Sequence, residues 1–184
     1  RTPGALLPEA DGTLRFGAMS GERSTDVPIS EIQISVDPDS SSGQGLAGIA
    51  FREGRTVVAN DFARDVRLGF WNRTYRLESI GSAAATPVLR DADSIGVLVF
   101  YSAEVDAFTD ETIRLIERMA ENVSFGLKMF ARERQKERLA QMFAALSATN
   151  EAIMRAETRE ELFDLVCDAA VMGGKFTSVT VALY

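Results

Sequence analysis

Aromatic and basic side chains are concentrated between Asp61 and Ser79, in the part of the chain best suited to bind a small molecule. Its arginines can clamp an anion through paired N–H donors, and its rings offer faces for stacking. These side chains are Arg64, Arg73 and Arg76, with Phe70, Trp71 and Tyr75. The alternative is structural: the aromatic residues fill the core, and the arginines pair with Asp61, Asp65 and Glu78 at the surface. Composition alone does not separate the two.

The predicted ligand-binding set extends from this segment into the neighbouring strands. It comprises Asn60, Phe62, Phe70, Trp71, Arg73, Tyr75, Arg76, Ser82 and Thr86. No residue pattern identifies the ligand or a cofactor.

The residue types that are missing are informative. The chain has no histidine, which removes imidazole metal sites and histidine-dependent catalytic triads. Its one cysteine, Cys167, excludes an intrachain disulfide and fits a reducing compartment. The run Gly43–Gly48 lacks the Lys-Ser/Thr of a phosphate loop. We therefore expect no catalytic residue and no metal ligand, and a protein that is not an enzyme.

Composition narrows the partners and the location. A net charge of -7 and a pI near 4.8 argue against nucleic-acid binding. No apolar run approaches the roughly 18–20 residues of a membrane span, so we expect no membrane contact from this segment and a cytoplasmic location. The first residues show neither an initiator methionine nor a signal-peptide pattern, which is typical of a segment cut from a longer protein.

A predicted β-hairpin must support the binding segment. Its limbs are residues 82–89 and 94–102, joined by a polar turn at 90–93. The second limb has apolar residues on both faces, so it belongs inside a sheet that is covered on both sides.

Shorter elements precede this hairpin. Strands are predicted to end near residue 7 and to cover residues 13–19, 31–36 and 56–60, with a short helix within 43–51 and another within 61–79. The pattern predicts an α+β fold, an antiparallel sheet flanked by helices.

Helical periodicity begins at Thr109, a plausible N-cap, and continues without a breaker to about Ser147. The helix carries two apolar seams that are out of register with each other: Ile113, Ile116, Ala120, Val123, Leu127 and Phe130, then Leu139, Met142, Phe143 and Leu146. The charged run 132–138 separates them, and we place a switchable joint there because two offset seams cannot both pack well in one supercoil. Thr158 and Glu161 then predict a capping box for a second helix, which ends at Gly173-Gly174. Residues 176–184 are predicted to form a strand.

Several ordered motifs resemble those of a GAF domain. They are Gly45-Leu-Ala-Gly-Ile-Ala, Gly54-Arg-Thr-Val-Val-Ala-Asn-Asp61, residues 82–89, Ile95-Gly-Val-Leu-Val-Phe and Phe108-Thr-Asp-Glu111. The resemblance covers about residues 5–130, and residues 148–184 look like the first helix and strand of a second such domain. It implies a bacterial multidomain sensory protein, divided into a sensor domain at 1–108 that lacks its first helix, a signalling helix at 109–147 and a fragment at 148–184.

The resemblance implies a small-molecule pocket over the sheet, with segment 61–79 as one wall. Members of the family that bind cyclic nucleotides carry an Asn-Lys pair and a longer Phe-to-Asp-Glu spacing, from which this chain departs at Phe108–Glu111. Members that bind bilins or reduce methionine sulfoxide use cysteines that this sensor segment lacks.

The resemblance also implies that most of the first strand is missing from the first domain. A missing interior strand exposes two ladders of backbone groups, and unpaired strands recruit partners. We therefore expect residues 176–184 to fill the gap. The sheet of a second copy of the chain is the favoured place, and the alternative is the same chain's own sheet, which would need a break in the helix near residues 131–138.

Together these observations predict a regulatory, small-molecule-sensing and dimerising module, a homodimer that relays a signal through its helix to a downstream output domain. The alternative is a degenerate GAF domain with a filled pocket that serves only in dimerisation.

Overall fold

The computed structural model describes residues 2–8, 11–20, 33–75, 79–174 and 177–182. It divides into two compact units, Arg1–Gly126 and Leu127–Tyr184, and the long helix α3 (Asp110–Arg155) crosses the division. Of the sequence-based predictions, Arg76, Glu78 and part of the strand 31–36 lie outside the described residues.

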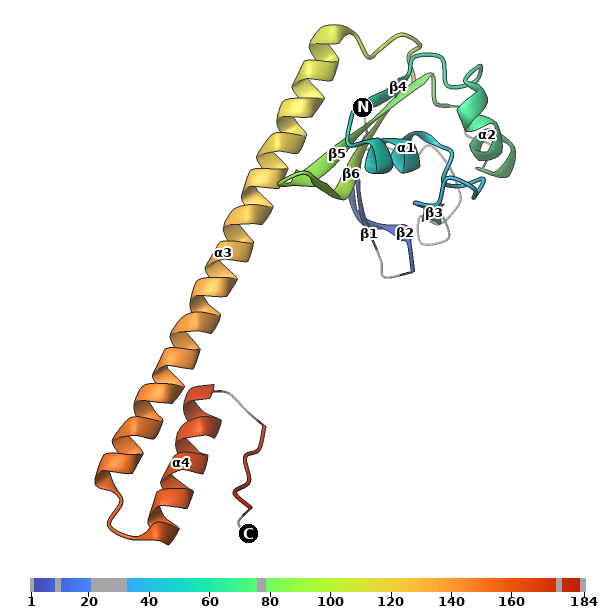
Figure 1. Ribbon diagram of the computed structural model, residues 1–184. Helices are drawn as coiled ribbons and strands as arrows, with labels where there is room; N and C mark the ends of the chain where they lie inside the picture. Colours follow the sequence, from blue (N-terminus) through green and yellow to red (C-terminus); the bar gives the residue numbers. More distant parts are fainter. Residues whose placement is uncertain (1, 9–10, 21–32, 76–78, 175–176, 183–184) are drawn as a thin grey trace. The chain divides into compact units, whose positions relative to one another are not determined.

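The first unit is built on an antiparallel sheet which, among the described residues, has six strands in the order β3-β2-β1-β6-β5-β4 (Figure 1). The strands are β1 (Thr2–Pro8), β2 (Thr13–Met19), β3 (Ile34–Ser35), β4 (Val57–Ala59), β5 (Ser82–Arg90) and β6 (Asp93–Ser102). The predicted hairpin is confirmed as β5 and β6. Its second limb lies between β1 and β5, as a strand with two apolar faces requires.

The expectation of a gap in this sheet is wrong. β1 pairs with β2 on one side and with β6 on the other, so the interior position is filled by the first residues of the chain itself. Its sequence, which contains Pro3 and Gly4, has weak strand propensity, and pairing on both sides overrides that local preference. The reason for exchanging a strand with a second copy is therefore gone.

One face of the sheet is covered by short helices. The helix α1 (Leu46–Glu53) packs on β4, β5 and β6 and ends at Gly54, whose φ of 64° is the left-handed C-cap conformation that glycine favours. The 3-10 helix η2 (Val66–Leu68) and the helix α2 (Gly69–Tyr75) follow β4. Figure 1 shows α1 and α2 on the side of the sheet opposite to the first turns of α3.

The first turns of α3 cover the other face. Thr109 caps the helix as predicted, with its hydroxyl accepting from the Thr112 N–H at 3.4 Å. Ile116 packs with Phe100 of β6 and with Phe108 in a second buried cluster. α3 therefore starts as a cover for its own sheet.

In the second unit, the rest of α3 and α4 (Arg159–Gly174) form a helical hairpin. At Gly173 a Cβ atom would lie 2.7 Å from the Ala145 Cα, so the two helices approach closely there. The predicted cap of α4 is present: the Glu161 N–H donates to the Thr158 hydroxyl at 3.2 Å, and the Glu161 carboxylate accepts from the Glu157 N–H at 3.0 Å.

The predicted strand at residues 176–184 is wrong over its described part. Residues 177–182 form no strand. The local pattern of Thr and Val favours a strand, but a strand also needs a neighbour to satisfy its backbone groups. Among the described residues, no strand pairs with residues 177–182.

Candidate functional site

Alternation along β5 separates two candidate binding regions on opposite faces of the sheet. Ala83 and Ala85 belong to the buried cluster under α1 and α2, whereas Ala84 belongs to the cluster under α3. Because neighbouring strand residues point to opposite faces, Thr86 shares the α3 face with Ala84. The aromatic segment and Thr86 therefore serve different surfaces.

Three aromatic residues of the predicted ligand set, Phe62, Phe70 and Trp71, pack in the core on the α1 face. Phe62 and Trp71 are buried, with exposed fractions of 2% and 8%, and Phe70 packs edge-on against Trp71 with ring centroids 5.5 Å apart. A Cβ atom at Gly45 would lie 2.3 Å from Trp71 Nε1, so glycine there lets the indole enter. This is the packing of the structural alternative, in which the rings plug the sheet face.

Two of the arginines predicted to bind an anion, Arg64 and Arg73, lie at the surface. Arg73 is exposed, and Arg64 forms an exposed ion pair with Asp61 at 3.5 Å. Tyr75 is the last residue of α2, and Arg76 lies outside the described residues. An anion clamp built from Arg64, Arg73 and Arg76 stays a prediction.

Arg67, another arginine of this segment, has a structural role. Its Nε donates to Asp65 Oδ1 at 2.9 Å, and its Nη2 donates to the Val58 carbonyl of β4 at 2.8 Å. The hydrogen bond from Arg67 lowers the pKa of the Asp65 carboxyl, against the opposing effect of burial. The pair fixes η2 on the end of the sheet.

Two polar members of the predicted set are engaged in the fold. The Asn60 side-chain amide donates to the Phe108 carbonyl and accepts from the Phe108 N–H, each at 3.1 Å. The hydroxyl of Ser82, which is fully buried, donates to the Glu104 carbonyl at 2.7 Å. Both hold the segment that leads from β6 into α3, and their role in ligand binding stays a prediction.

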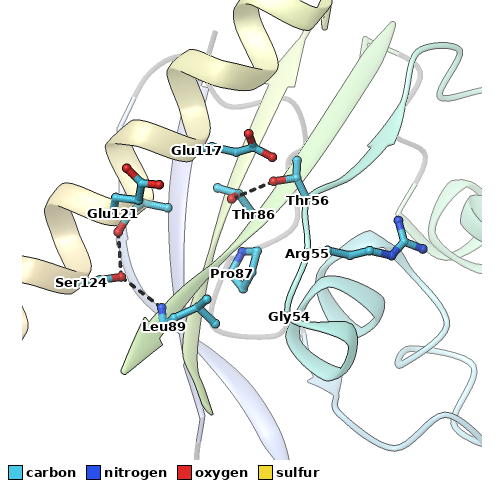
Figure 2. Close-up of a pocket in the computed structure, with 10 residues that line it drawn as sticks. Gly54, Arg55, Thr56, Thr86, Pro87, Leu89, Glu117, Glu121 and Ser124 are labelled. Carbon is cyan, nitrogen blue, oxygen red and sulfur yellow. Dashed lines mark hydrogen bonds between the residues drawn. The ribbon is translucent and has the colours of Figure 1, made fainter. Parts of the chain in front are cut away.

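Thr86 lines a cavity of about 460 Å³ between α3 and the β4–β5 side of the sheet. The cavity is lined by Gly54, Arg55, Thr56, Thr86, Pro87, Leu89, Glu117, Ala120, Glu121 and Ser124, all within the first unit (Figure 2). Of the described members of the predicted ligand set, only Thr86 lines this cavity.

Oxygen atoms dominate the polar lining. The Thr56 hydroxyl donates to the Thr86 hydroxyl at 3.1 Å, and Figure 2 shows the Glu117 carboxylate directed toward this pair. Ser124 accepts from the Leu89 N–H at 3.0 Å and donates to the Ala120 carbonyl at 2.8 Å, which joins α3 to the end of β5.

The sequence pattern did not predict this second region. Its apolar seam assigned Val123 to the buried side of α3, yet Val123 is 39% exposed and Ser124 faces the sheet. The available signal was Glu117, which follows the buried Ile116 and lies one turn before Glu121, so that both carboxylates flank the buried stripe.

In the part of the chain that the structure describes, no group of three or more Cys, Asp or Glu side chains is placed to hold a metal ion. No helix there has the length and apolar character of a membrane span.

The fold and the two sheet faces define a GAF domain. The family model "GAF domain" matches residues 5–128, and the chain belongs to this family of sensory and regulatory modules, which are found in sensor kinases. No curated protein matched the sequence.

Solved structures with the same fold support the assignment. A GAF domain from an Acinetobacter phosphoenolpyruvate-protein phosphotransferase is 14% identical, with a TM-score of 0.53 over 73% of this chain and 74% of its own. A domain assigned to a two-component sensor histidine kinase of Sinorhizobium meliloti 1021 is 17% identical, with a TM-score of 0.53 over 74% of this chain and 85% of its own.

A third structure corrects the prediction, made from the sequence, that the protein is not an enzyme. The type II free methionine-R-sulfoxide reductase of Thermoplasma acidophilum is 22% identical, with a TM-score of 0.52 over 67% of this chain and 75% of its own. The fold therefore hosts enzymes as well as regulatory domains. The absence of histidine excludes particular mechanisms, but it does not exclude an enzyme on this fold.

Proposed function

We propose that this chain is a regulatory GAF module that forms a homodimer through α3, responds to a small molecule and relays that response along α3 to an output domain. The proposal rests on the way α3 is used in the first unit: one side of the helix is docked on the sheet, and its other sides carry exposed apolar residues.

The exposed side chains carry the dimer proposal. Leu115 and Met119 are 55% and 41% exposed, and Phe125 is 67% exposed. Leu115 and Met119 lie one helical turn apart and therefore share a face. A large exposed apolar patch favours association, and a second copy of α3 offers a matching surface of the same kind.

The oligomeric state tests this directly. Light scattering on the chain is expected to give a dimer, and the double variant Leu115→Glu/Met119→Glu is expected to give a monomer with an unchanged circular dichroism spectrum. Arg118→Glu changes an exposed residue on the same helix and serves as the control. A monomeric wild type, or a double variant that stays dimeric, contradicts the proposal.

The cavity beside Thr86 supports the sensing part. It is walled by both β5 and α3, so an occupant touches the sheet and the helix together. A ligand shifts such a system only through its different affinity for the two arrangements. Native mass spectrometry of the purified chain is expected to show a retained small molecule or a mass shift on adding one.

A second candidate function is favoured by the packing of Phe62 and Trp71. If the site on the α1 face is permanently filled by these rings and the α3 cavity binds nothing, the module acts in dimerisation alone. Titrations that leave both the single tryptophan's fluorescence and the amide spectrum of α3 unchanged would support that candidate.

We also propose the wider organisation that the sequence suggests. Residues 148–184 would be the start of a second GAF-like domain, with 1–108 as the sensor and 109–147 as the signalling helix, in a bacterial cytoplasmic protein. The hairpin of α3 and α4 in the second unit is compatible with this organisation.

A further inference from the structure

We propose that the cavity between α3 and β5 binds a small aliphatic ammonium ion, with the Glu117 carboxylate as its charge partner and the Thr56 and Thr86 hydroxyls as hydrogen-bond acceptors. This deepens the sensing role and rests on that part of the proposed function. The inference comes from the size of the cavity, its charge and its balance of donors and acceptors.

The size suits a small molecule. A volume of about 460 Å³ lies in the lower half of the roughly 300–1,000 Å³ that ligand pockets occupy. Pro87 and Ala120 are buried and supply apolar wall, on which an alkyl chain can lie. The polar groups are placed around this apolar surface.

The charge of the lining is negative. Glu117 is half-buried and has no ion pair among the described residues, and Glu121 follows it one turn later. The single basic residue of the lining, Arg55, pairs with Glu53 at 2.6 Å and extends away from the cavity (Figure 2). A cation is therefore favoured in this cavity, and an anion is repelled.

The hydrogen-bonding groups of the lining also favour a donor. Ser124 already takes the Leu89 N–H, and Pro87 has no N–H. The Thr56 and Thr86 oxygens each keep lone-pair capacity, and Thr86 is only 2% exposed. An ammonium group carries three N–H donors and no acceptor, which complements a carboxylate and two hydroxyls.

Because the site lies between β5 and α3, a bound ligand can affect how α3 packs on the sheet. Glu117 belongs to the helix and Thr86 to β5, so one ammonium group that contacts both would hold them together. Binding is then expected to stabilise the docked position of α3. The coupling is reciprocal: whatever loosens α3 from β5 weakens binding.

The test is a calorimetric titration at constant ionic strength with 1,4-diaminobutane, and with the uncharged 1,4-butanediol as the matched probe. We expect saturable binding of the diamine with one site per chain and none of the diol. Constant ionic strength keeps the screening of the diffuse attraction to a protein with net charge -7 the same in every titration.

Three variants locate the site. Glu117→Gln is expected to weaken diamine binding by about tenfold or more, because a charge-assisted hydrogen bond is lost. Thr86→Val, a near-isosteric change, is expected to weaken it by a factor of about five. Glu111→Gln removes the same charge from an exposed position of α3 outside the lining and is expected to bind as the wild type does.

The outcomes separate this inference from the dimer. No saturable binding, equal binding of the diol, or equal weakening by Glu111→Gln and Glu117→Gln overturns the ammonium site. Light scattering on the same samples reports the oligomeric state independently, so a dimer without diamine binding leaves the dimer proposal standing alone.

Discussion

The side chain of Asn60 holds both backbone polar groups of Phe108, donating to its carbonyl and accepting from its N–H at 3.1 Å each. The Asn60 carbonyl also accepts from the Asp106 N–H at 2.8 Å. The end of β4 thus fixes the segment that enters α3, although the two residues are far apart in the sequence.

Replacing Asn60 should loosen this entry to α3. We expect Asn60→Ala to lower the free energy of unfolding by about 1–3 kcal/mol, because the Phe108 groups lose their partners near the buried Phe108 ring. Chemical denaturation measures the loss, and hydrogen exchange should show faster exchange at the amides of Asp106 and Phe108.

Asn122→Ala is the matched control, since Asn122 is an exposed asparagine on α3. It should change the free energy of unfolding by no more than about 0.5 kcal/mol. Equal losses in the two variants would show that the Asn60 contacts contribute nothing specific.

The approach of Gly45 to Trp71 predicts a second effect. A methyl group at residue 45 would meet the indole nitrogen at 2.3 Å, so Gly45→Ala should displace Trp71 and cost about 1–3 kcal/mol through overpacking. Trp71 is the only tryptophan, so a red shift of its fluorescence emission reports the displacement.

Gly126→Ala provides the opposite expectation. A Cβ atom at this position of α3 meets nothing within 4 Å, and alanine favours a helix interior over glycine by about 0.5–1 kcal/mol. Thermal melts should therefore show Gly126→Ala above the wild type and Gly45→Ala below it; the reverse order contradicts this account.

Ser124 accepts a hydrogen bond from the Leu89 N–H of β5 and donates one to the Ala120 carbonyl within α3, and a control variant can separate the two contributions to stability. Ser124→Ala should destabilise the first unit by about 1–3 kcal/mol, because the half-buried Leu89 N–H loses its acceptor. Thr149→Ala is the control: Thr149 also donates to the carbonyl four residues earlier, at 2.9 Å, but bonds to no strand among the described residues.

Denaturation at fixed pH compares these two variants. If α3 is held to β5 through this link, only Ser124→Ala should also speed the hydrogen exchange of the Leu89 amide. Exchange at Leu89 that is unchanged in Ser124→Ala would rule out the link.

Tyr101 predicts a pH dependence at the alkaline end. Burial raises the pKa of the Tyr101 phenol from 10.0 to about 12. Between these two pKa values the folded state keeps the phenolic proton and the unfolded state releases it. The stability that depends on this phenol is therefore fully present below pH 10 and is lost as the pH rises toward about 12.

Urea denaturation of the wild type and of Tyr101→Phe between pH 9 and about 12 measures this. The phenylalanine variant should lose less stability over that interval, because it has no phenol to ionise. Parallel curves for the two proteins would contradict the role of Tyr101.

Secondary structure could be predicted from the sequence where the local pattern and the burial of the residues agree. The hairpin of β5 and β6 follows from residues 82–102, because a run that is apolar on both faces has to lie inside a sheet. The caps at Thr109 and Thr158 also follow from local chemistry.

The sequence was insufficient where distant partners decide. β1 forms because β2 and β6 flank it, whereas residues 177–182 pair with no strand among the described residues. The α3 cavity joins Thr86 to Glu117, and no local pattern connects those two residues. The sequence pattern also misplaced the face of α3 that packs on the sheet: Ser124, and not Val123, contacts the sheet.

The interior position of β1 also determines when the sheet can be completed during synthesis on the ribosome. Thr2 pairs with Tyr101, so during synthesis β1 must wait about a hundred residues for its neighbour β6. Until β6 emerges, the nascent chain carries an early strand whose inner edge is open, and this interval is when a chaperone would be most useful.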